Sequence, residues 1–453
     1  MKTFKLPERI KKFANVFHNH SFELYVVGGA VRDFYVGKSV KDYDFATNAI
    51  PEQVISLFSH TIPTGIEHGT VTVMFNGEGF EVTTFRSEGS YTNFRHPDEV
   101  NFIGSIADDL MRRDFTINAL AVNTLTGELL DNHQGLSDLK NKTIRAIGIP
   151  EARFNEDSLR MLRAFRFSAV LGFSIEEKTI LAIKSCSSKI AQISFERIQE
   201  ELNKILTVPS PSKTFLDMER QGLLQYLLPE LTDCKGVGSK GIDNIDTFQH
   251  LCRSCDGAPR SNALVRWAAL LHDVGKPDTE IFDKDKTIFY GHDTLSAEIA
   301  DNILRRLKFS NQFRKEVIHL IRNHMFNYTH EWSDAAVRRF ISRIGTHSIH
   351  NLILLREADH YGAAGEALQQ PILSELIDRV NSFLVKNTAT KISDLAINGK
   401  DLMESGIKEG PVIGAILKLL LESVIDDPTL NRIELLLNIA NEMYSRYHLK
   451  EEP

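Results

Sequence analysis

Residues 24–47 of this chain read LYVVGGAVRDFYVGKSVKDYDFAT, and this stretch decides the fold of its N-terminal part. The apolar run Leu24–Val27 predicts a buried strand, and the pair Gly28–Gly29 allows a tight turn into a helix. Asp42 and Asp44 stand two residues apart, so in an extended strand both carboxylates project from one face. Carboxylates in this arrangement are able to bridge a pair of divalent metal ions.

Paired carboxylates after such a turn indicate transfer of a nucleotidyl group. Displacement of pyrophosphate from a nucleoside triphosphate develops charge on the attacking and the leaving oxygen, and two Mg²⁺ ions about 3.5–4 Å apart stabilise both. Hard cations of this kind prefer carboxylate oxygens. Glu81, in an adjacent β-rich run, fits a third carboxylate on a neighbouring strand. The free N–H groups of the helix that follows Gly28 and Gly29 would face the triphosphate.

The order of four segments resembles a known family. They are VGGAVRD at 27–33, DYD at 42–44, RRDFTINA at 112–119 and EDSLR at 156–160. A lone Asp-x-Asp is more common in a solvated turn, but this ordered set is similar to the class II tRNA nucleotidyltransferases, in particular the bacterial CCA-adding enzymes. The resemblance implies a template-independent enzyme that builds the tRNA 3′ end from CTP and ATP with Mg²⁺.

The resemblance also implies roles for individual residues. Asp157 and Arg160 are three residues apart, which would make them neighbours on one helical face, and the family uses the matching pair as a protein template for the incoming base. A carboxylate accepts from the exocyclic amine of cytosine or adenine, whereas uracil and guanine present a carbonyl there. The full set implied for nucleotide binding is Gly28, Gly29, Arg32, Arg113, Asp114, Asp157, Arg160, Arg163 and Arg166.

The segment 87–107 is rich in turn formers and lacks sustained periodicity. It resembles the family's flexible loop, which is needed to add the terminal A. Its presence favours CCA addition over CC addition.

The composition predicts a soluble cytoplasmic protein of several domains. The formal net charge is −7, so contacts to tRNA phosphates would require a local basic face. No apolar run approaches the roughly 20 residues that span a bilayer, and the N-terminus has no apolar segment of a secretory signal. The four cysteines of the chain argue against a disulfide framework, and we expect Cys252 and Cys255 to be structural residues of a helix.

Hydrophobic periodicity divides the chain into an α+β part and a long helical part. The expected fold is a polymerase beta-like nucleotidyltransferase head with a small mixed sheet, followed by an all-α neck, an HD-type body and a tail. The expected boundaries are 1–138 for the catalytic head, 139–208 for the base-recognising neck, 209–378 for the body and 379–453 for a tRNA-binding tail. The glycine-rich stretch 234–241 is the best linker candidate.

A second set of metal-ligand side chains follows in the helical part. His250, His272, Asp273, His292, His324 and Asp359 occur in the order of an HD-type phosphohydrolase. Imidazole and carboxylate ligands suit divalent transition metals. The resemblance offers precedents both for phosphatase or cyclic phosphodiesterase activity and for a helical scaffold without activity.

Two alternative functions remain open from the sequence. One is a tRNA nucleotidyltransferase restricted to the terminal A. The other is an HD metal-dependent phosphohydrolase whose head only senses nucleotides. A poly(A) polymerase is less favoured because the chain has no strongly basic extension, and the oligomeric state is not predicted.

Overall fold

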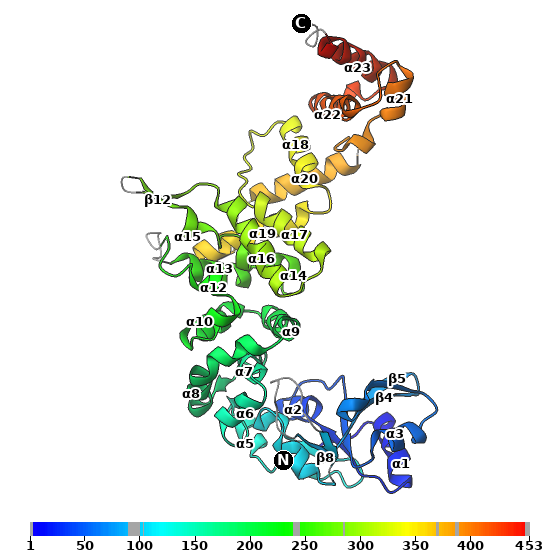
Figure 1. The fold of residues 1–453 in the computed structure, drawn as a ribbon, viewed down its shortest axis with the longest axis vertical. Helices are drawn as coiled ribbons and strands as arrows, with labels where there is room; N and C mark the ends of the chain where they lie inside the picture. Colours follow the sequence, from blue (N-terminus) through cyan, green and yellow to red (C-terminus); the bar gives the residue numbers. More distant parts are fainter. Residues whose placement is uncertain are drawn as a thin grey trace. The chain divides into compact units, whose positions relative to one another are not determined.

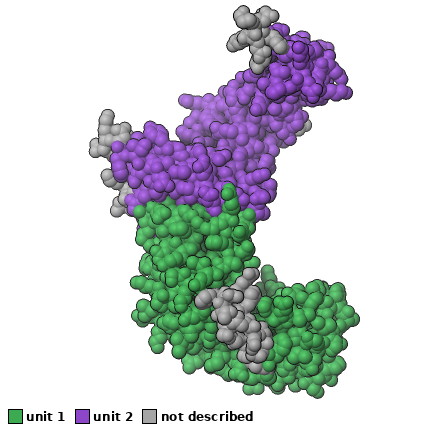
Figure 2. Space-filling model, viewed as in Figure 1, with its two compact units in different colours: residues 1–235, 303–309 green, residues 236–302, 310–453 purple. Residues whose placement is uncertain are grey.

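The computed structural model describes residues 3–88, 100–102, 104–238, 245–283, 286–367, 371–385 and 389–448. The chain forms two compact units, which Figure 2 shows in green and purple. The first contains residues 1–235 and 303–309, and the second contains 236–302 and 310–453. The division after Lys235 falls inside the stretch expected to be a linker, although residues 239–244 lie outside the described ranges.

The first unit is built around one mixed seven-stranded sheet of order β3-β4-β5-β2-β1-β8-β9. Its strands are β1 (Leu24–Val27), β2 (Asp44–Thr47), β3 (Thr61–Gly65), β4 (Thr70–Phe75), β5 (Glu78–Thr84), β8 (Ala121–Asn123) and β9 (Leu129–Leu130). Every neighbouring pair is antiparallel except β2 and β5, which run parallel. That parallel pairing places Asp44 directly opposite Glu81.

Helix α1 (Glu8–Asn19) packs its apolar side chains against one face of the sheet. Phe13 of α1 is fully buried, and its ring centroid lies 5.0 Å from that of Phe45 and 4.7 Å from that of Phe80. All four residues of β1 are buried, as their continuous apolar sequence predicts. The packing fixes β2 and β5, the two strands that present the carboxylates.

Helices complete the first unit, and Figure 1 shows those from α6 to α10 following the sheet region along the chain. They are α2 (Gly29–Val36), α3 (Pro51–Leu57), α4 (Ile106–Met111), α5 (Gly135–Lys140), α6 (Pro150–Glu156), α7 (Leu159–Leu171), α8 (Glu177–Cys186), α9 (Phe195–Leu206), α10 (Pro211–Arg220), α11 (Leu224–Leu227) and α12 (Pro229–Thr232). The 3₁₀ helices are η1 (Ile66–His68), η2 (Thr116–Asn118) and η3 (Ser187–Gln192). Short strands form two further pairs, β6 (Arg86–Glu88) with β7 (Val100–Phe102) and β10 (Thr143–Ile144) with β11 (Ser174–Ile175).

Where it is described, the second unit contains helices and one pair of strands, β12 (Glu280–Asp283) with β13 (Lys286–Phe289). Its helices are α13 (Thr247–Gly257), α14 (Ala263–Leu271), α15 (Lys276–Thr279), α16 (His292–Arg306), α17 (Asn311–Asn323), α18 (Asp334–Ile344), α19 (Ile349–Ala364), α20 (Pro371–Val385), η4 (Ile392–Asp394), α21 (Gly399–Glu404), α22 (Pro411–Asp426), η5 (Pro428–Leu430) and α23 (Ile433–His448). The last residues of α16 group with the first unit. Cys252 and Cys255 are buried free thiols on α13, as expected.

Two glycines bring α13 and α19 unusually close together. A Cβ on Gly362 would lie 2.1 Å from Ser254 Oγ, and a Cβ on Gly257 would lie 2.5 Å from Tyr361 Cβ. Larger side chains at either position would force the helices apart. This close approach matters because α13 contains His250 and α19 contains Asp359.

Three differences from the expected elements stand out. Strand β3, the pair β10 and β11, and the hairpin β12–β13 were not predicted, and the neck and the body are therefore not purely helical.

Within the described residues, no helix has both the length and the hydropathy needed to cross a bilayer.

Candidate functional sites

The first candidate site begins at the parallel pair β2 and β5. Asp44 opens β2 with an exposed side chain, and Glu81 is its register partner. Asp42 lies two residues earlier, just outside the strand, and is also exposed. The pKa of the Asp44 carboxyl is raised, first because surrounding protein atoms remove water from it and second because the Glu81 charge lies nearby; Asp42 adds to the effect. Such mutual repulsion between carboxylates favours a bound cation.

The turn between β1 and α2 lies beside these carboxylates. Gly28 has φ +64°, and a Cβ there would lie 3.1 Å from Arg113 Nη1. Arg32, on the first turns of α2, donates to Asp33 Oδ1 and to Asn118 Oδ1, both at 2.8 Å. Any side chain at position 28 would therefore strain the backbone and crowd an arginine.

These groups open into a pocket of about 330 Å³ in the first unit. Its lining is unusually cationic for a chain with a negative net charge. The lining residues are Gly28, Gly29, Arg32, Asp44, Arg112, Arg113, Asp114, Asn118, Asp157, Arg160, Arg163, Phe167 and Arg197. Six arginines against three aspartates in this set suit a polyanionic ligand such as a triphosphate.

Arg112 and Arg113 share one buried carboxylate. Arg112 Nη2 lies 2.8 Å from Asp109 Oδ1, and Arg113 Nη2 lies 3.3 Å from Asp109 Oδ2. Burial opposes ionisation of Asp109, but the two guanidinium groups lower its pKa below the ordinary value. Asp109 thus holds two pocket arginines in place, a role that the sequence did not reveal.

Asp114 is a buried partner of Arg163. Arg163 donates to Asp114 Oδ2 from Nε at 2.8 Å and from Nη2 at 2.6 Å, while Asn118 Nδ2 and the Phe115 N–H donate to Oδ1. Burial alone would raise the pKa of Asp114, but the Arg163 charge and these hydrogen bonds lower it to about 2. In this structure Asp114 therefore orients Arg163, and the nucleotide contact that the resemblance implies for Asp114 stays a prediction.

The expected geometry of Asp157 and Arg160 is wrong. Helix α6 ends at Glu156 and α7 begins at Leu159, so Asp157 lies in an extended break between two helices rather than on a helical face. Its carboxylate accepts from the Leu159 N–H at 3.1 Å and from Arg197 Nη2 at 2.7 Å. Arg160 instead donates to Glu156 Oε2 at 2.8 Å and to the Arg112 carbonyl at 2.9 Å. Both residues nevertheless line the pocket.

The Phe167 ring of α7 contacts three arginines, two from α7 and one from α2. The guanidinium carbons of Arg32, Arg163 and Arg166 lie 5.3, 5.4 and 4.0 Å from its ring centroid. Arg166 does not line the pocket and lies 2.6 Å from buried Glu201; burial is the main reason that its pKa is lowered. Arg166 is therefore paired with Glu201 rather than part of the pocket lining, and its expected role in nucleotide binding stays a prediction.

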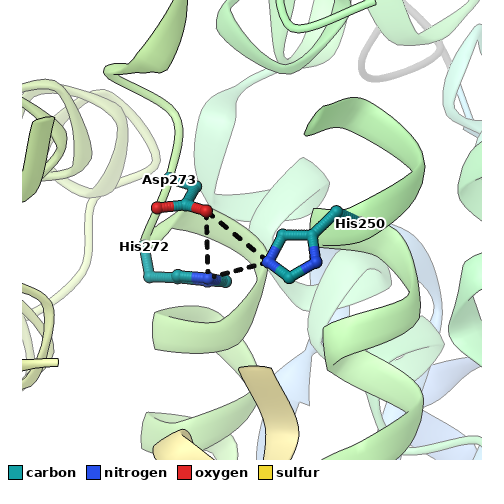
Figure 3. Close-up of side chains that lie close together, drawn as sticks. All are labelled: His250, His272 and Asp273. Atoms are coloured by element: carbon teal, nitrogen blue, oxygen red, sulfur yellow. Dashed lines mark hydrogen bonds and ion pairs between the residues drawn. The ribbon is translucent and has the colours of Figure 1, made fainter. Parts of the chain in front are cut away.

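The second candidate site lies in the second unit, where the structure brings together all of the histidines and aspartates expected from the sequence. Two groups have ligand atoms within 4.8 Å of one another: His250, His272 and Asp273, and Asp273, His292 and His324. Asp273 belongs to both groups. Figure 3 shows the first of them, with the two imidazoles and the carboxylate directed toward one another.

Short distances connect this cluster. His250 Nε2 lies 3.1 Å from His272 Nε2, and the two nitrogens lie 3.2 and 3.4 Å from Asp359 Oδ1. Asp273 Oδ1 lies 3.2 Å from His292 Nε2 and 3.6 Å from His324 Nε2. Asp359 thus joins the first group, and Asp273 connects the two.

Backbone carbonyls hold three of the imidazole rings through Nδ1. His272, His292 and His324 place Nδ1 3.0, 2.7 and 2.7 Å from the carbonyls of Ala269, Phe289 and Ile321. A proton on each Nδ1 leaves Nε2 with a free lone pair, which is the tautomer that ligates a metal. Among the described residues, buried Asp273 Oδ1 and His292 Nε2 have no hydrogen-bond partner. The donor set therefore fits a divalent transition metal.

Burial and mutual contacts shift the pKa values of three residues in the cluster. Burial opposes the charge on Asp273, but the charge of His272 and the contacts with His292 and His324 lower its pKa well below the ordinary value. Burial lowers the pKa of His272. Burial would lower the pKa of His292 as well, but its contact with Asp273 raises it overall.

Comparison with known proteins places both units in one family. Three family models match the chain: "Poly A polymerase head domain" at residues 24–145, "Probable RNA and SrmB- binding site of polymerase A" at 172–235, and a tRNA nucleotidyltransferase domain 2 at 288–440. The loop expected at 87–107 falls within the first match, but residues 89–99 and 103 lie outside the described ranges.

Curated relatives extend over nearly the whole chain. The CCA-adding enzyme of Leuconostoc mesenteroides is 34% identical over 98% of this chain and 98% of its own length, and that of Enterococcus faecalis is 33% identical over 98% and 99%. A crystal structure of the Bacillus stearothermophilus CCA-adding enzyme in complex with CTP is 28% identical, with a TM-score of 0.75 over 99% of this chain and 100% of that one. The structure of the Thermotoga maritima enzyme complexed with tRNA, at 21% identity and a TM-score of 0.58, shares the fold. With a third of its residues identical to curated relatives over its whole length, this chain belongs to the CCA-adding enzyme family of tRNA nucleotidyltransferases.

Proposed function

We propose that the pocket of the first unit adds the CCA end to tRNA, taking CTP and ATP and releasing pyrophosphate. The observation that carries this proposal is the placement of Asp44 opposite Glu81, beside a pocket lined by six arginines. The relatives reported above are CCA-adding enzymes, and one of their structures contains CTP. This agreement favours CCA addition over addition of the terminal A alone.

The proposed reaction joins the tRNA 3′ oxygen to the α-phosphorus of the nucleotide. The bond between that phosphorus and pyrophosphate breaks, and the hydroxyl proton leaves to solvent. Asp42, Asp44 and Glu81 would hold Mg²⁺, because their oxygen donors are those that hard cations prefer. When bound, two such ions stabilise charge on the attacking and the leaving oxygen. Arg32 and Arg113, with the N–H groups at the start of α2, would hold the triphosphate.

Base selection is assigned to Asp157 and Arg160. Asp157 would accept from the exocyclic amine of cytosine or adenine, and Arg160 would donate to the ring nitrogen beside it. Uracil and guanine would leave the carboxylate facing a carbonyl, and a site built to hydrogen-bond one partner rejects such analogues strongly. Both residues line the pocket, but Asp157 lies in the helix break and Arg160 on α7, and each has a different partner, so they would act as separate groups rather than as one ion pair.

A direct assay tests this function. A tRNA transcript lacking CCA is incubated with CTP and ATP, singly and together, and its length is read on a sequencing gel. We expect two additions with CTP alone and three with both nucleotides. Addition of A only, and only to a tRNA that already ends in CC, would replace the proposal with the A-adding alternative.

The buried free cysteines agree with a reducing compartment. The proposal therefore places the enzyme in the cytoplasm.

We propose a second activity for the histidine and aspartate cluster of the second unit, namely metal-dependent hydrolysis of a phosphoester. The observation that favours it is the set of Nε2 atoms directed at Asp273 while Nδ1 of three rings is held by backbone carbonyls. A bound transition metal would supply an activated water. The chain itself would supply the ligands His250, His272, Asp273, His292, His324 and Asp359.

Metal analysis and hydrolysis assays test this second activity. Full-length protein is purified without added metal, and its metal content is measured by mass spectrometry. Hydrolysis of a phosphomonoester and of a 2′,3′-cyclic nucleotide is then measured with and without Mn²⁺ or Ni²⁺. Protein that neither binds metal nor hydrolyses these substrates would show the cluster to be part of a helical scaffold.

A further inference from the structure

The Asp157 carboxylate is held by a residue that comes from another helix. Asp157 lies in the break between α6 and α7, where its backbone is extended with φ −143°. One oxygen accepts from the Leu159 N–H, and the other accepts from Arg197 Nη2 at 2.7 Å. Arg197 belongs to α9, forty residues along the chain.

The Arg197 guanidinium is committed to this one contact. Among the described residues, Asp157 is the only hydrogen-bond partner of its side chain, and its Nη1 atom is buried without a partner. The side chain also lines the nucleotide pocket. An arginine whose interactions converge on one carboxylate restricts the rotation of that carboxylate.

Helix α9 is rigidly placed to make this contact. Its inner face is buried through Ile198, Leu202 and Ile205. Glu201, one turn after Arg197, is also buried and lies 2.6 Å from Arg166 Nε of α7. The packing of α7 against α9 thus fixes the position of the Arg197 backbone, from which the side chain reaches the pocket.

We infer that Arg197 is a positioning residue for base selection: it holds the Asp157 carboxylate so that a lone pair faces the incoming base amine. This inference rests on the proposed function of Asp157. A carboxylate offers about four acceptor positions, and the two donors seen here occupy only part of them. The remaining acceptor positions of the Asp157 carboxylate therefore point in one direction. A base amine that approaches from that direction is accepted, whereas a base carbonyl is rejected.

Another role for Arg197 has a different consequence. As a cation in the lining of the pocket, it could bind the triphosphate instead of acting through Asp157. Loss of a triphosphate contact would weaken all four nucleotides equally, since their phosphates are identical. Loss of a positioning residue would change the ratio between nucleotides.

The test compares kcat/KM for CTP, ATP, UTP and GTP in the wild type, Arg197→Met and Arg197→Lys. We expect the UTP-to-CTP ratio to rise by about tenfold or more in Arg197→Met, because sites that select by hydrogen bonds lose selectivity when those bonds are misplaced. Arg197→Lys keeps a donor and should restore part of the selectivity. Arg220→Met is the matched control, because Arg220 is exposed in the same unit and pairs with Asp217 across one turn of its own helix, away from the pocket lining.

A double-mutant cycle shows whether Arg197 acts through Asp157. If it does, Asp157→Ala combined with Arg197→Met should select bases no worse than Asp157→Ala alone. An equal fall for all four nucleotides, or a further loss of selectivity in the double variant, would overturn the inference. A wild-type protein that fails to add CCA would instead contradict the proposed function, and thermal melts of each variant identify any loss of folding.

Discussion

At the scale of single residues, two glutamates of strand β5 have different expected roles, one in the proposed catalysis and one at the protein surface. Glu81 and Glu78 lie on the same strand, but only Glu81 pairs in register with Asp44, whereas Glu78 contacts Arg9 at the protein surface. We expect Glu81→Gln to lower kcat for nucleotide addition by about 10- to 100-fold, the range found when groups that support a metal ion are removed. Asp44→Ala should abolish addition. Incorporation of radiolabelled ATP measures both, and an equal loss in the control Glu78→Gln would show that the effect is not specific to the site.

The buried pair of Asp114 and Arg163 gives a prediction about pH and stability. Because the pKa of Asp114 falls from an ordinary 3.8 to about 2 in the folded state, its ionised form stabilises the fold at pH values above the unfolded pKa. That stabilisation, about 2 kcal/mol for a shift of this size, is lost as the pH falls through the folded pKa. Asp114→Asn should therefore lower the melting temperature by several degrees at pH 7, and the difference from the wild type should shrink from pH 4 toward pH 2. Differential scanning calorimetry measures it, with Asp217→Asn as the control because Asp217 is half-buried and pairs with exposed Arg220. A pH-independent difference would contradict the assignment.

The sequence predicted the residues of the site better than it predicted their partners. Glu81 lies opposite Asp44 on a neighbouring strand, as the sequence predicted. The expected strand through Asp42 and Asp44 begins only at Asp44, so the alternation expected of this pair is not seen. Asp157 and Arg160 were expected to be neighbours on one helix, but each has found a different partner. Arg197 was missed because its contact with Asp157 depends on how elements pack together. Asp109 contacts Arg112 and Arg113 three and four residues along the chain, so that spacing was a local signal the sequence offered. The available signal for Arg197 was its place in a strongly amphipathic helix, next to the buried positions Ile198 and Leu202.

At the scale of elements, the two glycines at the ends of α2 form a matched pair for comparison. Gly28 and Gly37 bracket α2, and both have positive φ, +64° and +86°. A Cβ at Gly28 would lie 3.1 Å from Arg113 Nη1, whereas a Cβ at Gly37 would meet nothing within 4 Å. Gly28→Ala and Gly37→Ala should both destabilise the fold by roughly 1–2 kcal/mol, the cost of a left-handed conformation. Only Gly28→Ala should raise the KM for nucleotides, and kinetics alongside urea denaturation distinguish the two effects.

Elements with strong periodicity were predicted, and short paired strands were not. Apolar residues recur at helical spacing in 158–171 and 196–206, which predicts helices there, and α7 and α9 agree with these ranges. Strand β3 was missed because its sequence, Thr61–Gly65, contains a proline and has no buried residue. The pair β10 and β11 has only two residues in each strand, so pairing between distant segments rather than local sequence defines it.

At the scale of the whole molecule, each candidate site is made by residues of one compact unit. The nucleotide pocket belongs entirely to the first unit, and the histidine and aspartate cluster belongs entirely to the second. The division after Lys235 agrees with the linker expected from glycine density, a compositional signal that is independent of packing. The finer boundaries at residues 138, 208 and 378 stay predictions, since clustering of contacts separates only two units.

This separation predicts that the two sites can be disabled independently. His272→Ala combined with Asp273→Ala removes two buried members of the cluster, so the variant should lose bound metal and any phosphoester hydrolysis. Its addition of CCA should stay within about twofold of the wild type, because substitutions in separate regions without shared partners act additively. Conversely, Asp44→Ala should lose CCA addition and keep the metal content of the second unit.

The measurements are metal content by mass spectrometry and product length on a sequencing gel, both on full-length protein. His330→Ala is the matched control, since His330 lies in the second unit but is exposed and contacts Glu375 rather than the cluster. Circular dichroism and a thermal melt establish that the double variant is folded, which matters because both residues are buried. Loss of CCA addition in a folded double variant would mean that the second unit contributes to nucleotide transfer through its cluster. In that case the two sites would be energetically coupled, and a metal in the second unit would act as an effector of the first.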